Sequence, residues 1–188
     1  NLDYYYELHN SDLPVFVQIT HTVTSLNILY LPEFHEYFKN TYPNFKIWNN
    51  AVHYPKWISA PVLPRKARTM ISDKLLRYKW LPAYKAECQA LVNFMNSPLY
   101  ENGDSVVDSL KGKFDADKLK FFDERSSQQK WTIFKSQIVG GDIYREENFV
   151  TVFPELYDLI KHEFDYDAEF EAVSTAGFLP VSQGEYSN

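Results

Sequence analysis

The chain has 188 residues and a net charge of −6, and 45% of its residues are hydrophobic. This length suits one domain or one and a half, and the apolar content is enough to bury a core, which excludes a chain that is disordered throughout. The 19 lysine and arginine residues form no basic stripe, so we expect no nucleic-acid partner.

The cysteine content and the first residues bear on the cellular compartment and on whether the chain is part of a longer protein. The single cysteine, Cys88, cannot form an internal disulfide or, alone, a thiolate-rich metal site, so a reducing cytoplasm is expected. No apolar run approaches the ~18–20 residues that span a bilayer, so we expect no membrane partner. The opening run, NLDYYYELHN, lacks both a signal-peptide pattern and an initiator methionine. We therefore expect the chain to be a piece of a longer protein.

One part of the chain follows the pattern strand, loop, helix, strand, loop. A β-rich run at Val15–Ile19 precedes a polar turn at His21–Asn27 and an amphipathic helical pattern from 31 to 40. A second β-rich run at Phe45–Trp48 ends in another polar loop, Asn49–Tyr54. A crossover between two parallel strands is the natural form of this unit, so both loops should meet at one rim, where α/β folds bind ligands.

The remainder of the chain carries mostly helical patterns. Prolines between residues 55 and 64 predict an extended loop there. Helical stretches follow at 65–78, 83–95, 105–110, 116–134 and 155–164, the fourth of them capped by Asp115. The run Gly140-Gly141-Asp142 predicts a break between helices, and the last residues are expected to form an extended or disordered tail.

Several of these runs resemble one enzyme family. They are VQITHTVTSLNILYLPEFHEYF with FKIWNNAVHYPKWISAPVLP and, further on, Arg145–Phe149 with Phe153–Leu156. Together they are similar to the twitch-domain group of radical S-adenosylmethionine (radical SAM) proteins, a group frequent in phages and marine bacteria. The resemblance covers roughly residues 14–160. It implies an α/β fold: a partial radical SAM-type (β/α) barrel, of which the chain holds the last parallel strands, followed by a mostly helical C-terminal extension.

This resemblance also divides the chain. Residues 1–63 would form the C-terminal βα units of the partial barrel, 64–164 the helical extension and 165–188 the tail. The family's defining loop, CxxxCxxC, is absent from the sequence. In the family that loop holds a 4Fe-4S cluster through three thiolates, and such clusters need several thiolate ligands. The resemblance thus assigns S-adenosylmethionine and the cluster to the intact protein, and we expect no cofactor on this chain alone.

The resemblance places functional side chains in the two polar loops. The cofactor-binding candidates are Thr22, Thr24, Asn27, Asn49 and Val52. The substrate-pocket candidates are Asn50, His53 and Tyr54. Hydroxyl and amide groups of this kind suit the ribose and adenine edges of the cofactor.

Structural roles are the alternative for the same residues. Ser25 or Asn27 would cap the following helix, and the second loop would be stabilised by its own side-chain-to-backbone hydrogen bonds. His53 could titrate near neutral pH, although a lone histidine is more often structural than catalytic. The five histidines show no HExxH spacing, which excludes a zinc site of the metalloprotease type, and we expect no metal ligands.

Two functions remain open from the sequence. In the first, the chain is a fragment of a radical SAM enzyme, contributes the adenosine-side and substrate-pocket wall, and is inactive without its missing N-terminal half. The substrate, a peptide or a small molecule, is not identified. In the second, the chain is a non-enzymatic binding or assembly module, and an exposed strand edge at Val15–Ile19 pairs with a partner chain.

Overall fold

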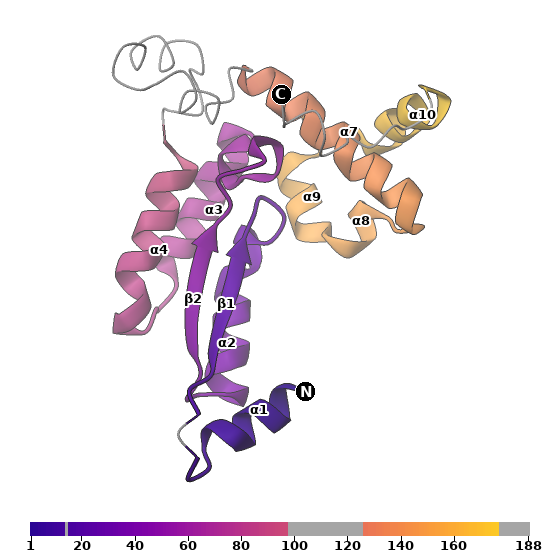
Figure 1. Ribbon diagram of the computed structural model, residues 1–188. Coiled ribbons are helices and arrows are strands. Elements are labelled where there is room, and N and C mark those ends of the chain that lie inside the picture. The colour runs from indigo at the N-terminus through magenta and orange to yellow at the C-terminus, as the bar shows by residue number, and fades with distance from the viewer. Residues whose placement is uncertain (14, 98–125, 177–188) are drawn as a thin grey trace, which may run out of the picture.

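A two-stranded parallel sheet lies at the centre of the computed structural model, which describes residues 1–13, 15–97 and 126–176 (Figure 1). Strand β1 (Gln18–Val23) pairs with β2 (Lys46–Ala51), and Val23 lies opposite Ala51 at the carboxyl end. The predicted parallel pair is confirmed. The described residues contain no further strand, so the α/β class is shown while a barrel is not.

Both strands begin and end later than predicted: β1 starts at Gln18 instead of Val15 and β2 at Lys46 instead of Phe45, and the two predicted loops are wrong in their first residues. His21 and Thr22 belong to β1, and Asn49 and Asn50 belong to β2. Along β1 exposed residues alternate with more buried ones up to Val23, as expected for a strand with one covered face. Thr22 suits a strand because threonine has a high β-propensity. The polar side chains of His21 and Asn49 bond to partners, so their polarity does not end the strands.

Helix α2 (Leu31–Thr41) crosses from β1 to β2 and covers one face of the sheet, as predicted. It follows a short 3-10 turn, η1 (Ile28–Tyr30). Leu31, His35 and Phe38 are its buried residues at helical spacing. Helix α1 (Leu2–His9) lies near the amino ends of the strands, where the ring of Tyr6 packs edge-on against two aromatic rings of a small core.

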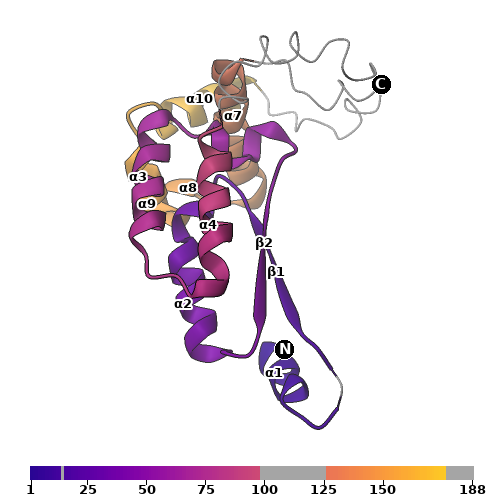
Figure 2. The same cartoon turned by 90° about the vertical axis from the view of Figure 1, so that its left-hand side faces the viewer.

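Helices α3 (Arg65–Arg77) and α4 (Pro82–Met95) confirm the next two predicted helices. Together with α2 they lie on one side of the sheet (Figure 2). Their buried residues join the main hydrophobic core. The segment between β2 and α3, predicted as an extended loop, contains two 3-10 turns, η2 (Lys56–Ile58) and η3 (Ala60–Val62).

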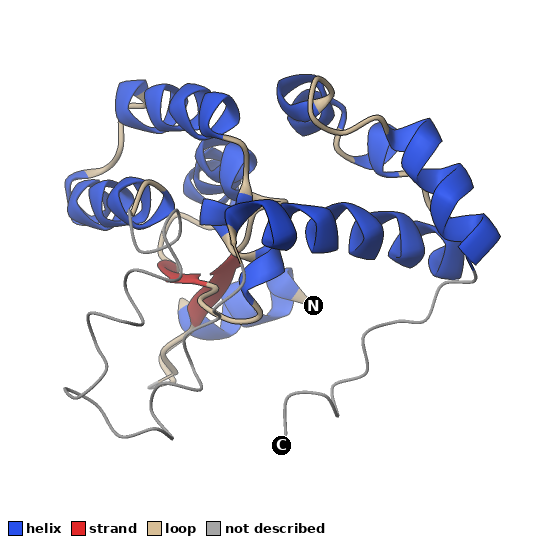
Figure 3. Ribbon diagram, turned by 90° about the horizontal axis from the view of Figure 1, so that it is seen from above, coloured by secondary structure: helices blue, strands red, loops and turns tan. Residues whose placement is uncertain are grey.

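The C-terminal region is helical, and helices dominate the described residues as a whole (Figure 3). Its elements are α7 (Ser127–Arg145), α8 (Phe149–Val152), α9 (Pro154–Ile160) and α10 (Tyr166–Ala176). Ser126 and Gln129 form a capping box at the start of α7. The predicted helix at 105–110 and the predicted cap at Asp115 lie outside the described residues.

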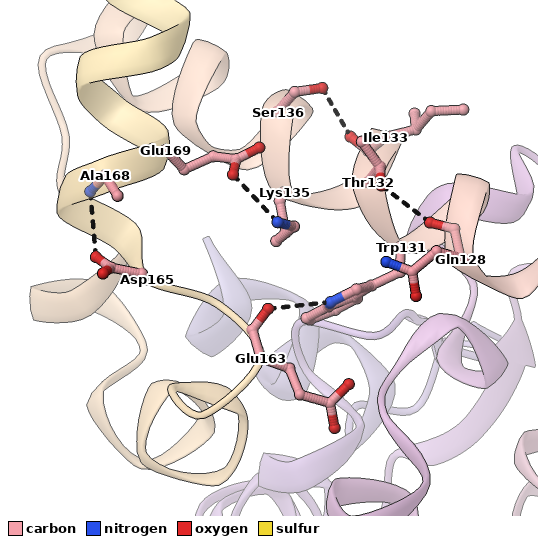
Figure 4. A network of polar contacts seen from close by, with 10 residues as sticks. All are labelled: Gln128, Trp131, Thr132, Ile133, Lys135, Ser136, Glu163, Asp165, Ala168 and Glu169. Carbon is pink, nitrogen blue, oxygen red and sulfur yellow. Dashed lines mark hydrogen bonds and ion pairs between the residues drawn. The ribbon is translucent and has the colours of Figure 1, made fainter.

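The predicted tail is wrong for residues 166–176, which form α10. This helix packs against α7 through an ion pair in which Lys135 Nζ lies 3.1 Å from Glu169 Oε2 (Figure 4). The indole N–H of Trp131, in α7, donates to the carbonyl oxygen of Glu163, which precedes α10, at 3.2 Å. Tertiary contacts therefore order a segment whose acidic composition suggested otherwise. Residues 177–188 lie outside the described part.

The predicted break at Gly140–Asp142 is also wrong, because α7 runs through it to Arg145. Gly140 and Asp142 are both buried. A glycine within a helix costs about 1 kcal/mol relative to alanine, which packing can offset. The helix ends instead at Arg145, and its C-cap, Glu146, adopts the left-handed conformation with φ 55°.

Candidate functional site

The loops that follow the two strands meet at one rim of the sheet, as the sequence predicts for parallel strands. Ser25 joins them, and Ser59 fixes the second loop to itself. Both the backbone N–H and the Oγ of Ser25 donate to the carbonyl oxygen of Ile58, each at 2.9 Å. Ser59 Oγ donates to the carbonyl oxygen of Val52 at 2.6 Å. Ser25 and Ser59 are fully buried, so the rim is a fixed part of the fold.

Side chains in the turn after β1 are engaged with their own backbone. Asn27 Oδ1 accepts from the N–H of Thr24, and Asn27 Nδ2 donates to the carbonyl oxygen of Thr22, both at 2.8 Å. Thr24 Oγ1 accepts from the N–H of Leu26 at 3.2 Å. Asn27 does not cap the following 3-10 turn with its side chain; its hydrogen bonds stabilise the turn after β1.

The loop after β2 carries the more accessible candidates. Val52 continues the ladder by donating its N–H to the carbonyl oxygen of Val23 at 2.9 Å. The ring of His53 packs on Phe94, with 4.4 Å between ring centroids. Burial lowers the pKa of His53, and the charge of Lys56 lowers it further, so this imidazole is neutral at pH 7. Tyr54 is 48% exposed at the edge of the rim.

The structure divides the strand candidates between two faces of the sheet. Thr22 and Asn50 lie opposite each other and are exposed on the face that α2 leaves bare. Trp48 is on the same face, 58% exposed, and its indole N–H donates to Asn50 Oδ1 at 2.7 Å. Asn49 is 8% exposed and turns to the helical side. Asn49 therefore shares no pocket with Thr22 and Asn50.

Asn49 is instead the centre of a polar cluster, buried at Asn49 and His35 and half-buried at its other members, that the sequence reasoning missed. We call His21, His35, Asn49 and Glu87 the Asn49 cluster. Asn49 Oδ1 lies 3.2 Å from His21 Nδ1, and Asn49 Nδ2 lies 3.0 Å from His35 Nε2. Glu87 accepts from both the backbone N–H and the Nδ2 of Asn49, at 2.8 and 3.2 Å. The cluster joins β1, α2, β2 and α4.

Aromatic rings enclose both histidines of the cluster. His21 stacks on Phe34 with 3.9 Å between centroids, and His35 lies edge-on to Trp80 and Tyr84 at 4.9 and 4.8 Å. Burial lowers the pKa of both imidazoles, although the contact of each ring with the Asn49 side chain opposes the shift.

Parts of this cluster had a signal in the sequence. His21 alternates with Ile19 and Val23, and His35 lies on the apolar stripe of its helix, so both positions predict inward-facing side chains. Glu87 has no comparable signal, because its partner Asn49 is 38 residues away.

No family model, curated protein or solved structure matches this chain. Within residues 1–13, 15–97 and 126–176, no three or more histidine, cysteine or acidic side chains form a group that could hold a metal ion, and no helix is both long and apolar enough to cross a membrane.

Apart from the rim, a groove of about 640 Å³ lies between α2 and α3. Its polar groups are already paired. Lys74 Nζ lies 2.6 Å from Glu33 Oε1, and the hydroxyl of Tyr78 donates to Glu36 Oε2 at 2.5 Å. The groove thus offers no convergent set of unpaired polar groups to a ligand.

Replacing Glu87 with alanine should lower the free energy of unfolding by about 2–3 kcal/mol, because two donors of Asn49 lose a charged acceptor. Urea unfolding followed by circular dichroism measures the change. Lys85→Ala, an exposed change on the same helix, should stay within about 0.5 kcal/mol of the parent. Equal effects of the two substitutions would contradict the role assigned to Glu87.

Proposed function

We propose that this chain is the closing end of a partial (β/α) barrel of the radical SAM type. It would supply the adenosine-side and substrate-pocket wall of an enzyme that works in a reducing cytoplasm. The cluster-binding half would come from a missing N-terminal part. The proposal rests on the resemblance together with one structural observation, the different state of the two sheet edges.

The outer edge of β2 is closed. The N–H of Ile47 donates to the hydroxyl of Tyr84 at 3.2 Å, and the N–H of Asn49 donates to Glu87 at 2.8 Å. These side chains of α4 take the hydrogen bonds that a further strand would make. The sheet therefore ends at β2, as expected for the last strand of a partial barrel.

The outer edge of β1 is open. Odd-numbered residues of β1 bond toward β2, so the backbone groups of Gln18 and Thr20 point away from it. Nothing in the described residues bonds to them, and no charge or proline protects this edge. A further parallel strand on this side would also approach the bare face, where Phe16 and Trp48 are 60% and 58% exposed.

The residues present do not fit an iron–sulfur cluster. Cys88 is the only cysteine, is 3% exposed, and lies on α4. Burial raises the pKa of its thiol to about 11, and the charge of Glu87 adds to the shift. A neutral, buried thiol is no cluster ligand. This chain would therefore contribute a wall, with Thr22, Asn50, His53 and Tyr54 as the groups facing the ligand.

Titration of the chain with S-adenosylmethionine, followed by amide NMR, tests the proposal. We expect weak binding, with a Kd of about 1 mM, because only one wall of the cavity is present. Shifts should concentrate at the rim. Asn50→Ala should weaken binding several-fold, and Gln18→Ala, an exposed change at the far end of the sheet, should not. Unshifted rim amides at several millimolar ligand would refute the assignment.

The open edge also favours the second candidate, a non-enzymatic assembly module whose β1 pairs with a partner chain. Sedimentation equilibrium separates the two functions. A monomer that binds S-adenosylmethionine supports the enzyme fragment, whereas an obligate oligomer without affinity for it supports the module.

A further inference from the structure

The Asn49 cluster joins the sheet to α4 through a chain of hydrogen bonds whose directions can be assigned. Asn49 Nδ2 is a donor, and its nearest imidazole atom is His35 Nε2 at 3.0 Å, so this nitrogen accepts. His21 Nε2 lies 3.4 Å from Asn27 Nδ2, which is also a donor. His21 Nδ1 then carries the proton donated to Asn49 Oδ1 at 3.2 Å. Each imidazole thus keeps one acceptor nitrogen and is neutral.

The groups that face these imidazoles come from every neighbouring element. The turn after β1 presents the amide of Asn27, α2 presents the ring of Phe34, and the rings of Trp80 and Tyr84 flank His35. Glu87 of α4 is the carboxylate of the cluster, and its two oxygens are both used by Asn49.

A second proton on either imidazole would therefore have an amide N–H as its nearest neighbour. At His35 the added proton would face Asn49 Nδ2 at 3.0 Å, and the acceptor Asn49 Oδ1, 3.3 Å from the same nitrogen, is already shared with His21. At His21 the added proton would face Asn27 Nδ2. Rotation of the Asn49 amide could relieve the first conflict only by withdrawing its Nδ2 from Glu87. A buried donor without an acceptor costs about 1–3 kcal/mol.

We propose that the Asn49 cluster is a proton-sensitive latch. On mild acidification, protonation of His21 and His35 breaks the bonds that hold α4 against the edge of β2, and α4 separates from that edge. The latch uses only residues of this chain and is independent of any cofactor. It would open the sheet edge that α4 otherwise closes.

The pKa directions agree with this geometry. Burial is the largest cause of the lowered pKa of each imidazole, and His21 lowers the pKa of His35 further. A histidine with a lowered pKa in the closed state takes up its proton preferentially in the open state. The latch is therefore fully closed above pH ~6.5 and weakens as the pH falls below that value.

Amide hydrogen exchange measures the latch directly. The N–H groups of Ile47 and Asn49 bond to α4 and report its separation. Between pH 7.5 and 5 we expect their protection factors to fall by up to about tenfold per pH unit for each histidine. The buried Ile138 of α7 should keep its protection, which distinguishes local opening from global unfolding.

A histidine NMR titration of the unmodified protein provides a second test. Nitrogen shifts should show a neutral ring with Nδ1–H at His21 and should place both pKa values below ~6.5. The double variant His21→Gln/His35→Gln should flatten the exchange profile, and the exposed control His162→Gln should not. If the double variant does not fold, the titration and exchange of the parent decide. Protection at Ile47 and Asn49 that is constant down to pH 5, or imidazoles that titrate near pH ~6.5, would overturn the latch.

Discussion

Replacing Asp142 with alanine is expected to lower the free energy of unfolding by about 3–5 kcal/mol. The carboxylate is 4% exposed, and its Oδ2 accepts from the N–H of Phe149 at 2.5 Å and from the hydroxyl of Tyr166 at 2.6 Å. Phe149 and Tyr166 are themselves buried, so both donors would be left without an acceptor. The three residues hold α7, α8 and α10 together, and urea unfolding measures the loss.

Asp158 provides the matched control for this substitution. It is exposed and pairs with Lys161, which lies three residues further along the chain. Asp158→Ala should cost less than about 1 kcal/mol, as surface ion pairs do. Asp142→Asn keeps one acceptor oxygen and should fall between the two. Similar losses from Asp142→Ala and Asp158→Ala would show that the buried bonds do not hold the helices together.

Replacing Arg68 with alanine is expected to cost about 3 kcal/mol and to loosen the rim of the site. Arg68 is 5% exposed; its Nε donates to the carbonyl oxygen of Leu63 at 3.0 Å, and its Nη1 donates to that of Met95 at 3.2 Å. Leu63 ends the segment that follows β2, and Met95 is the last residue of α4. The guanidinium charge thus also stabilises the carboxyl end of a helix.

Two measurements distinguish this role from a general loss of packing. Urea unfolding gives the stability change, and amide exchange at Ser25, whose N–H bonds to Ile58 in the rim, should become faster in Arg68→Ala. Arg68→Lys keeps the charge but lacks the planar fork, so it should recover only part of the loss. Arg65→Ala removes an exposed arginine from the first turn of the same helix and should leave both measurements unchanged. Unaltered exchange at Ser25 in Arg68→Ala would contradict a link to the rim.

The rim shows how far sequence reasoning reached into the candidate site. The two loops were predicted to meet because consecutive parallel strands place their carboxyl ends together, and the bonds from Ser25 to Ile58 and from Val52 to Val23 confirm it. The side chains expected there do not all lie on one face. Thr22 and Asn50 face the bare side, Asn27 staples its own turn, and Asn49 is buried on the helical side. A strand alternates its faces at every residue, so once the strand continues through Asn49 and Asn50 these two neighbours lie on opposite sides of the sheet.

Two further differences between the predicted and the observed elements arise at polar residues, for the same physical reason. At Asp142 a polar residue next to two glycines indicates a break, yet its carboxylate binds Tyr166, 24 residues later, and the helix continues. Asn49 indicates a loop, yet it binds Glu87, 38 residues later, and remains in the strand. Local patterns carry no information about such distant partners, and the free energy of a buried hydrogen bond exceeds the local preference.

By itself, the sequence determined the parallel strand pair, the crossing helix and the two helices that follow, because apolar spacing along the chain is a local property that specifies which face is buried. Only the tertiary structure decided which strand edge is open, which polar side chains are buried, and that residues 166–176 are helical. Those outcomes depend on contacts between distant segments, in which α4 supplies acceptors to β2 and α7 supplies partners to α10. A polar side chain is buried only where a hydrogen-bond partner is present, and for these residues the partner lies far away in the sequence.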